Sequence, residues 1–226
     1  MTDKMMKDPV NNNLLAIKKK IGIARLGLMN NQVWEEDPRR LLFTMSRYKF
    51  VAKMFSGCKN VLEVGCGDAF FSRLVKQEVE ELVVSDFDPL FIEDIEERMS
   101  SRWVMETQVV DMLNEPADGI FDAIYCLDVL EHIAPEKESI FLSNMLKNLK
   151  KDGKAIIGMP SLESQLYASP ASKDGHINCK TGDSLANFLQ SYFHHVFIFS
   201  MNDEVIHTGY QKMAHYLIAL CCQKRD

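Results

Sequence analysis

From residue 60 onward, short apolar runs alternate with segments whose apolar residues recur at helical spacing. Runs of four to eight apolar or β-branched residues are typical of strands, and apolar residues at every third or fourth position are typical of helices. The pattern predicts strands over 60–64, 81–86, 103–111, 120–127 and 154–159, and helices over 67–76, 89–99 and 135–149. Alternation of this kind predicts a parallel sheet covered by helices on both faces.

The pattern changes on both sides of this alternating region. Before it, Asp37-Pro38 is typical of a helix start, and apolar residues at helical spacing predict a helix over 38–55. After it, a helix over 182–192 precedes strands over 195–201 and 215–222, with no helix between them. Strands joined without a crossover helix pair antiparallel. The predicted fold class is α/β: a doubly wound, mostly parallel seven-stranded sheet with an antiparallel C-terminal strand.

Composition and charge narrow the classes of partner. The chain has 226 residues, of which 46% are hydrophobic, and a formal net charge of −6. Its apolar stretches are too short to span a bilayer, so we expect no membrane span. An acidic balance argues against nucleic acid as the main partner, because such binding depends on clustered cations. The oligomeric state stays open.

The six cysteines favour a reduced protein. No two of them have the CxxC spacing of a zinc ribbon or a thioredoxin-like centre. Four lie in apolar runs, where buried thiols are common, namely Cys66, Cys126, Cys221 and Cys222. Residues 1–4 lead into no apolar stretch of the kind found in secretory signals. We therefore expect a cytoplasmic location.

The strongest local signal is a glycine turn at the end of the first predicted strand. Gly65, Cys66 and Gly67 follow an apolar run and precede a predicted helix. Such a turn is where a doubly wound sheet binds a nucleotide. A third glycine, which the dinucleotide fingerprint requires, is replaced by Phe70. A nucleoside ligand without phosphates therefore fits better than a dinucleotide, and a purely structural turn is the alternative.

Acidic residues follow the next two predicted strands. Asp86 comes 19 positions after Gly67, close to the spacing of an acid that binds ribose hydroxyls. Asp88 precedes Pro89 and is typical of a helix cap. Asp111, followed by Met112, ends the third predicted strand, where it can accept from an adenine amino group or lie in an exposed loop.

These features together resemble a known family. The segments are Glu63-x-Gly65-Cys66-Gly67, Asp86-x-Asp88-Pro89, Asp111, 121–133 with its Asp128-Val129-Leu130-Glu131-His132 run, and 146–153. They look like class I S-adenosylmethionine-dependent methyltransferases. The run from Asp128 to His132 is similar to the small-molecule group that includes ubiquinone-biosynthesis O-methyltransferases. The motifs cover roughly 58–160, and Ala69 stands where the family often has a further glycine.

The resemblance implies S-adenosylmethionine as the cofactor and gives roles to matching positions. Glycines 65 and 67 would pass beside the methionine part and ribose, with Glu63 supporting that loop or the cofactor amino group. Asp86 would bind the ribose hydroxyls, and Asp128 would face the sulfonium. The implied cofactor set is Glu63, Gly65, Cys66, Gly67, Asp86, Phe87, Asp111, Met112 and Asp128. A single domain over 1–226 would comprise a helical cap (1–56), a cofactor-binding core (57–160) and a substrate-side loop, helix and hairpin (161–226).

Methyl transfer to a hydroxyl requires removal of a proton, and histidine is the usual general base near neutral pH. His132 and His176 are the candidate bases, with Glu131 beside the first. The alternatives are a histidine that fixes the loop and an exposed loop residue, respectively. Asp128, Glu131 and His132 could also hold Mg²⁺, but no residue is assigned as a metal ligand.

The expected activity is methylation of a small hydroxylated molecule, such as a sugar, a nucleotide-sugar or a phenolic compound. The first alternative is N- or carboxyl-methylation, including that of modified RNA bases. The second is a catalytically silent module that binds S-adenosylmethionine. A nicotinamide-dependent oxidoreductase is disfavoured by Phe70 in the glycine turn.

Overall fold

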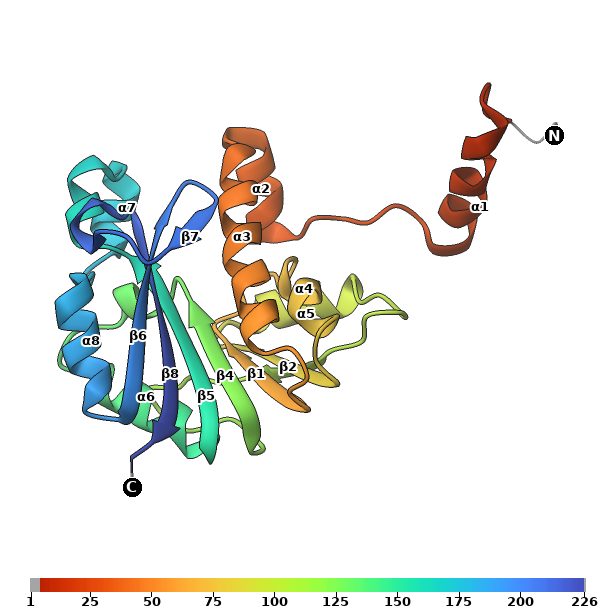
Figure 1. Cartoon of the computed structure of the whole chain (residues 1–226). Coiled ribbons are helices and arrows are strands. Elements are labelled where there is room, and N and C mark those ends of the chain that lie inside the picture. Colours follow the sequence, from red (N-terminus) through yellow and green to blue (C-terminus); the bar gives the residue numbers. More distant parts are fainter. Residues whose placement is uncertain (1–4, 226) are drawn as a thin grey trace.

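An eight-stranded sheet forms the centre of the molecule (Figure 1). The computed structural model describes residues 5–225, so residues 1–4, on which the signal-sequence argument drew, lie outside it. The strands are β1 (Asn60–Val64), β2 (Glu81–Asp86), β3 (Glu106–Val109), β4 (Phe121–Leu127), β5 (Leu149–Pro160), β6 (Phe193–Asn202), β7 (Val205–His207) and β8 (Tyr216–Lys224). Their order is β3-β2-β1-β4-β5-β8-β6-β7.

The strand directions confirm the mostly parallel sheet with an antiparallel C-terminal strand. Strands β1 to β5 run parallel, and β8 pairs antiparallel with both β5 and β6. The predicted count of seven strands is wrong, because β7 pairs antiparallel with β6 at the edge of the sheet. Asp203 has a φ of +49°, which lets the chain reverse directly after β6. A segment expected as an open polar loop therefore begins with an eighth strand.

Helices lie on both faces of the sheet (Figure 1). The α-helices are α1 (Asn12–Ile21), α2 (Leu28–Glu36), α3 (Arg39–Met54), α4 (Ser72–Lys76), α5 (Pro89–Glu97), α6 (Glu138–Lys147), α7 (Pro170–Gly175) and α8 (Gly182–Gln190). Short 3₁₀ turns are η1 (Pro9–Asn11), η2 (Leu130–His132), η3 (Glu163–Tyr167) and η4 (Gln211–Met213). Apolar side chains of α3, α4 and α5 form one core with the sheet, and those of α6 and α8 form a second.

The helix predicted over 67–76 is shorter in the structure, because α4 begins only at Ser72. Ala69, with a φ of +49°, interrupts helical geometry. The carboxylate of Asp68 also accepts from the backbone N–H of Phe70 (3.1 Å) and from the backbone N–H of Asn30 in α2 (2.7 Å). The segment between Gly67 and α4 is therefore a turn fastened to the N-terminal helices. The other predicted elements are present with shifted ends.

Side-chain alternation in β8 decides which of its cysteines is buried. Cys66, Cys126 and Cys221 are buried as predicted, whereas Cys222 is only partly buried. Neighbouring residues of a strand point to opposite faces, and Cys221 takes the core side. All six cysteines are free thiols.

The first helix stands apart from the rest of the chain. In Figure 1, α1 lies away from the sheet and is joined to α2 by an extended segment. All of its residues are at least partly exposed, and Lys18, Lys19 and Lys20 occupy its last turn. Among residues 5–225, no helix is long and apolar enough to cross a membrane.

Candidate active site

The glycine turn links the end of β1 to the segment before α4. Gly65 and Gly67 have φ values of +71° and +52°, which side chains other than glycine rarely adopt. A Cβ on Gly65 would lie 2.4 Å from Cγ2 of Val129, and one on Gly67 would lie 2.6 Å from Sδ of Met29. Glycine is therefore required by both the backbone conformation and the close neighbours.

Asp86 fastens the end of β2 to this turn. Its Oδ2 accepts from the backbone N–H of Gly67 (2.9 Å), and its Oδ1 accepts from that of Asp88 (3.0 Å). Burial raises the pKa of Asp86. The Asp88 side chain caps α5 by accepting from Leu90 N–H (2.9 Å), as its sequence position predicted. Phe87, between the two acids, is 70% exposed beside the turn.

Glu63 ties three elements together in the interior. Its two carboxylate oxygens accept from the hydroxyls of Tyr48 in α3 and Tyr125 in β4, each at 2.6 Å. Burial raises the pKa of Glu63 to about 7. Both oxygens therefore already have a donor within the protein, and neither donor belongs to the turn. The implied role of Glu63 toward the turn or the cofactor amino group stays a prediction.

The end of the third strand is held by its own side chains. Asp111 accepts from the backbone N–H of Leu113 (2.9 Å) and from Nδ2 of Asn114 (2.8 Å). Met112 is buried in the core with residues of β4 and α6. The adenine contacts implied for Asp111 and Met112 stay predictions.

Asp128 follows β4 and carries an ion pair with the cap. Nη1 of Arg47 in α3 donates to both of its oxygens, at 2.7 and 2.9 Å. The Arg47 guanidinium carbon lies 3.7 Å from the centroid of the Tyr216 ring, a cation–π arrangement. Asp128 itself has a φ of +58°, so its position depends on a left-handed backbone.

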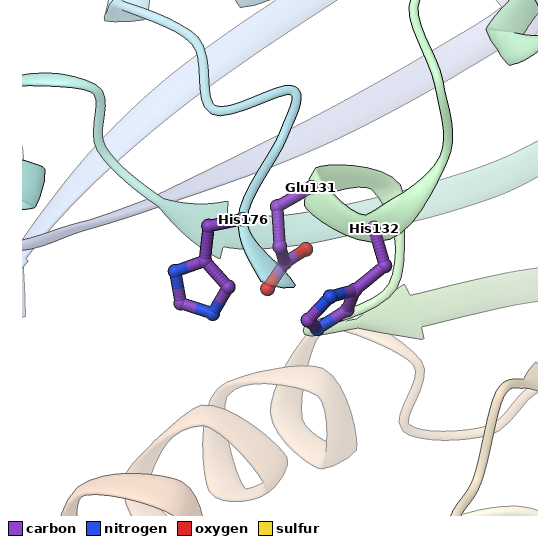
Figure 2. Close-up of side chains that lie close together, drawn as sticks. All are labelled: Glu131, His132 and His176. Carbon is purple, nitrogen blue, oxygen red and sulfur yellow. The ribbon is translucent and has the colours of Figure 1, made fainter. Parts of the chain in front are cut away.

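Glu131, His132 and His176 form a cluster beside Asp128. Figure 2 shows the carboxylate of Glu131 between the two imidazole rings, although His176 comes from the segment after α7. One ligand atom from each of the three lies within 4.8 Å of the others. Glu131 is fully buried, and burial raises its pKa well above the ordinary range, with the charge of Asp128 acting in the same direction.

The neighbours of the two histidines determine which ring nitrogen carries the proton. Nδ1 of His132 lies 2.9 Å from the carbonyl oxygen of Gly175, which only accepts, so this nitrogen is the donor. Nδ1 of His176 lies 3.0 Å from Oε1 of Gln165. The Gln165 amide nitrogen donates to Ser161 O and Ser164 Oγ, which fixes Oε1 as the acceptor. In the neutral rings, both Nε2 atoms therefore hold a lone pair.

Unpartnered polar atoms gather at the same place. Six buried side-chain nitrogen or oxygen atoms of the described residues lack a hydrogen-bond partner, and four of them are Nε of Arg47, both carboxylate oxygens of Glu131 and the Tyr216 hydroxyl. Buried polar groups without partners are uncommon and costly. Their concentration makes this place the candidate site for a ligand or an ion.

The structure thus brings together Asp128, Glu131, His132 and His176, as a shared site requires. Sequence reasoning missed Tyr216 and Gln165. Neither residue carries a motif, and each reaches the site only through the pairing of β8 with β5 or the path of η3. Arg47 lies on the helix predicted over 38–55, which is expected either to be a lid over the cofactor or simply to cover the sheet. The sequence did not indicate that Arg47 pairs with Asp128.

Comparisons with known proteins agree with the resemblance that the sequence motifs carry. Residues 61–153 match the family of methyltransferase domains. The chain is 24% identical over 136 residues to the mitochondrial ubiquinone biosynthesis O-methyltransferase of Schizosaccharomyces pombe, a match that covers 55% of this chain and 48% of that protein. The chain thus matches about half the length of that relative.

Two further relatives are methyltransferases by name. An uncharacterized methyltransferase of Staphylococcus carnosus is 27% identical over 149 residues, which cover 66% of this chain and 69% of that protein. The N-methyltransferase NodS of Bradyrhizobium japonicum, solved with S-adenosyl-L-homocysteine, superposes with a TM-score of 0.65 at 18% identity. That superposition covers 88% of this chain and 94% of NodS.

Residues 61–153 match a methyltransferase domain, and the sheet has the Rossmann-like fold of solved S-adenosylmethionine-dependent methyltransferases. The resemblance in the motifs is thereby confirmed. S-adenosylmethionine is the cofactor of this class, and the carboxylates of Asp86 and Asp128, at the carboxyl ends of β2 and β4, suit a cationic nucleoside.

Proposed function

We propose that this protein transfers the methyl group of S-adenosylmethionine to a hydroxyl of a small molecule, such as a sugar, a nucleotide-sugar or a phenolic compound. The observation that carries the proposal is the gathering of unpartnered polar atoms beside Asp128, next to two histidines with free Nε2 lone pairs. A hydroxyl acceptor needs such a group to take its proton. Residues 57–160 would bind the cofactor. Residues 161–226, together with the helical cap (1–56), would bind the acceptor.

The reaction is a direct displacement. The acceptor oxygen forms a bond to the methyl carbon while the bond from that carbon to sulfur breaks, and S-adenosylhomocysteine leaves. The acceptor proton passes to Nε2 of His132 or His176. Asp128 would hold the sulfonium. The nucleoside and methionine parts would be held by the other residues of the implied cofactor set, namely Glu63, Gly65, Cys66, Gly67, Asp86, Phe87, Asp111 and Met112. Alignment of the reactants supplies most of the rate enhancement.

As an alternative to the role of base, Glu131, His132 and His176 fit a divalent cation, which would occupy the Nε2 lone pairs. Both imidazoles present Nε2 lone pairs while their Nδ1–H groups are held by protein oxygens, as in histidines that bind metals. A cation would also compensate the buried carboxylate of Glu131. Two imidazoles favour a first-row transition ion over the Mg²⁺ considered from the sequence. Such an ion, when bound, would lower the pKa of the acceptor hydroxyl.

Calorimetric titration with S-adenosylmethionine, S-adenosylhomocysteine and NAD tests the cofactor part of the proposal. We expect the first two to bind and NAD not to bind. Tight binding of NAD without binding of S-adenosylmethionine would overturn the proposal. A panel of sugars, nucleotide-sugars, phenols and amines, with release of S-adenosylhomocysteine as the readout, then tests the acceptor atom.

N-methylation is the second candidate, because the fold is shared with the N-methyltransferase NodS. Turnover of amines but not of hydroxylated compounds in the same panel would favour it. The net charge of −6 favours a small molecule over nucleic acid. The six free cysteines support a reducing compartment, and we propose the cytoplasm.

A further inference from the structure

A cavity of about 290 Å³ is lined in part by His176, a member of the cluster of Glu131, His132 and His176. Of its lining residues, His176 belongs to that cluster, Arg47 is paired with Asp128, and Tyr216 packs against the guanidinium of Arg47. Among the described residues that line it, none is acidic. Its size suits a small molecule, since ligand pockets begin at about 300 Å³. A molecule in this cavity would lie next to the groups proposed to take its proton.

The Nε–H group of Arg47 is available to donate a hydrogen bond to such a molecule. Its Nη1 serves Asp128, but its Nε is buried and has no partner. The contact between its guanidinium carbon and the Tyr216 ring, together with the ion pair, fixes where the remaining N–H groups lie. A fixed guanidinium edge with a free N–H is the group that proteins use to bind carboxylates and phosphates.

His215 supplies a second donor to the same cavity. The backbone N–H of Asp203 donates to Nδ1 of His215 (3.3 Å), so the ring proton is on Nε2. Burial lowers the pKa of His215, with the charge of Arg47 acting in the same direction and that of Asp203 against it. Arg47 and His215 both line the cavity, whose carboxylate neighbour Asp128 is already paired.

We propose that the acceptor is an anion: a small hydroxylated molecule whose carboxylate or phosphate binds Arg47 and His215 while its hydroxyl lies at His132 and His176. The inference rests on the proposed function and specifies its substrate class. Charge is compatible with it, because Asp128 is already paired with Arg47 and none of the described residues that line the cavity is acidic.

Matched pairs of acceptors test the inference on the protein loaded with S-adenosylhomocysteine. The pairs are 3,4-dihydroxybenzoate with catechol, and glycerol 3-phosphate with glycerol, and binding is measured by calorimetry. We expect at least one anionic member to bind about tenfold or more tightly than its neutral partner. Arg47→Met should remove that preference. Arg47→Lys, which keeps a cation for Asp128 but lacks Nε, should remove part of it.

Arg40→Met is the matched control, since Arg40 is an exposed residue of the same helix. It should leave the preference intact. Equal binding of charged and neutral members, no binding of any anionic member, or the same behaviour of the Arg40 and Arg47 variants would overturn the inference. Binding of S-adenosylhomocysteine is recorded for each variant. If the unaltered protein fails to bind it, the proposed function itself falls.

Discussion

Arg47 in α3 and Asp128 after β4 are 81 residues apart in the chain, yet Nη1 of the arginine donates to both oxygens of the aspartate. This ion pair joins the helical cap to the end of the sheet where the cofactor is expected. The backbone of Asp128 is left-handed, with a φ of +58°. The arginine side chain is 14% exposed and that of the aspartate 38%, so water screens the pair only in part.

Asp128→Asn tests whether this carboxylate faces the sulfonium. Asparagine tolerates a left-handed backbone, so the loop should persist. S-adenosylmethionine carries the sulfonium charge, and S-adenosylhomocysteine does not. We expect calorimetric affinity for the former to fall about tenfold more than for the latter.

The exposed Asp118 gives the control substitution Asp118→Asn, which should change neither affinity. An equal loss of affinity for both ligands in the Asp128 variant would contradict a contact with the sulfonium.

Gly65→Ala should destabilise the protein and abolish cofactor binding. The new Cβ would meet Val129 at 2.4 Å in addition to the strain of a φ of +71°. Gly57→Ala separates the two effects, because Gly57 has a φ of +81° but nothing within 4 Å of its Cβ position.

From chemical denaturation, we expect a loss of about 1 kcal/mol for Gly57→Ala and a loss about 1–3 kcal/mol larger for Gly65→Ala. Adding Val129→Ala should recover part of the larger loss. Similar losses for the two single variants would show that the contact with Val129 is unimportant.

Glu63 should make stability depend on pH. Its pKa is raised from the usual 4.5 to about 7 in the folded protein. As pH rises from 4.5 to 7, Glu63 therefore loses its proton in the unfolded chain before it does so in the folded protein. The stability linked to the protonated group is present below about 4.5 and is lost as pH rises through about 7. Relative to the unaltered protein, Glu63→Gln should become more stable between pH 4.5 and 8, by at most about 3 kcal/mol.

Urea unfolding at several pH values measures this difference. Glu81→Gln, at the exposed start of β2, is the control and should show a constant difference. A constant difference for Glu63→Gln as well would contradict the raised pKa.

Divalent cations should stabilise the protein through the cluster at Glu131. After treatment with a chelator, Mn²⁺ or Zn²⁺ at about 100 times the dissociation constant should add about 2.7 kcal/mol to the free energy of unfolding. Glu131→Gln should lose this gain, because an amide is a poor replacement for the carboxylate ligand. Thermal unfolding with and without each ion measures the effect.

Glu163→Gln is the matched control, since Glu163 also has a buried unpartnered oxygen but belongs to η3 outside the cluster. It should keep the gain. If neither ion stabilises the unaltered protein and chelation leaves turnover unchanged, His132 and His176 act without a cation.

The spacing of apolar residues and the local turn and cap residues predicted most of the strands and helices. The alternation of apolar runs and helical segments depends on residues close in sequence, and the parallel sheet with its antiparallel β8 is present as predicted. The eighth strand and the short α4 were not predictable in this way. The first depends on a left-handed turn at Asp203, and the second depends on Ala69 and on bonds from Asp68 to Asn30.

The sequence by itself determined the glycine turn, the cap at Asp88 and the run from Asp128 to His132, because each is set by a few neighbouring residues. Only the tertiary structure decided that His176 joins Glu131 and His132, and that Arg47 pairs with Asp128. These contacts join elements distant in the chain. They form because α3 and the segments that follow β4 and α7 meet near the carboxyl end of β4. No local pattern encodes such contacts, since their distances and free lone pairs arise only once the elements have been packed together.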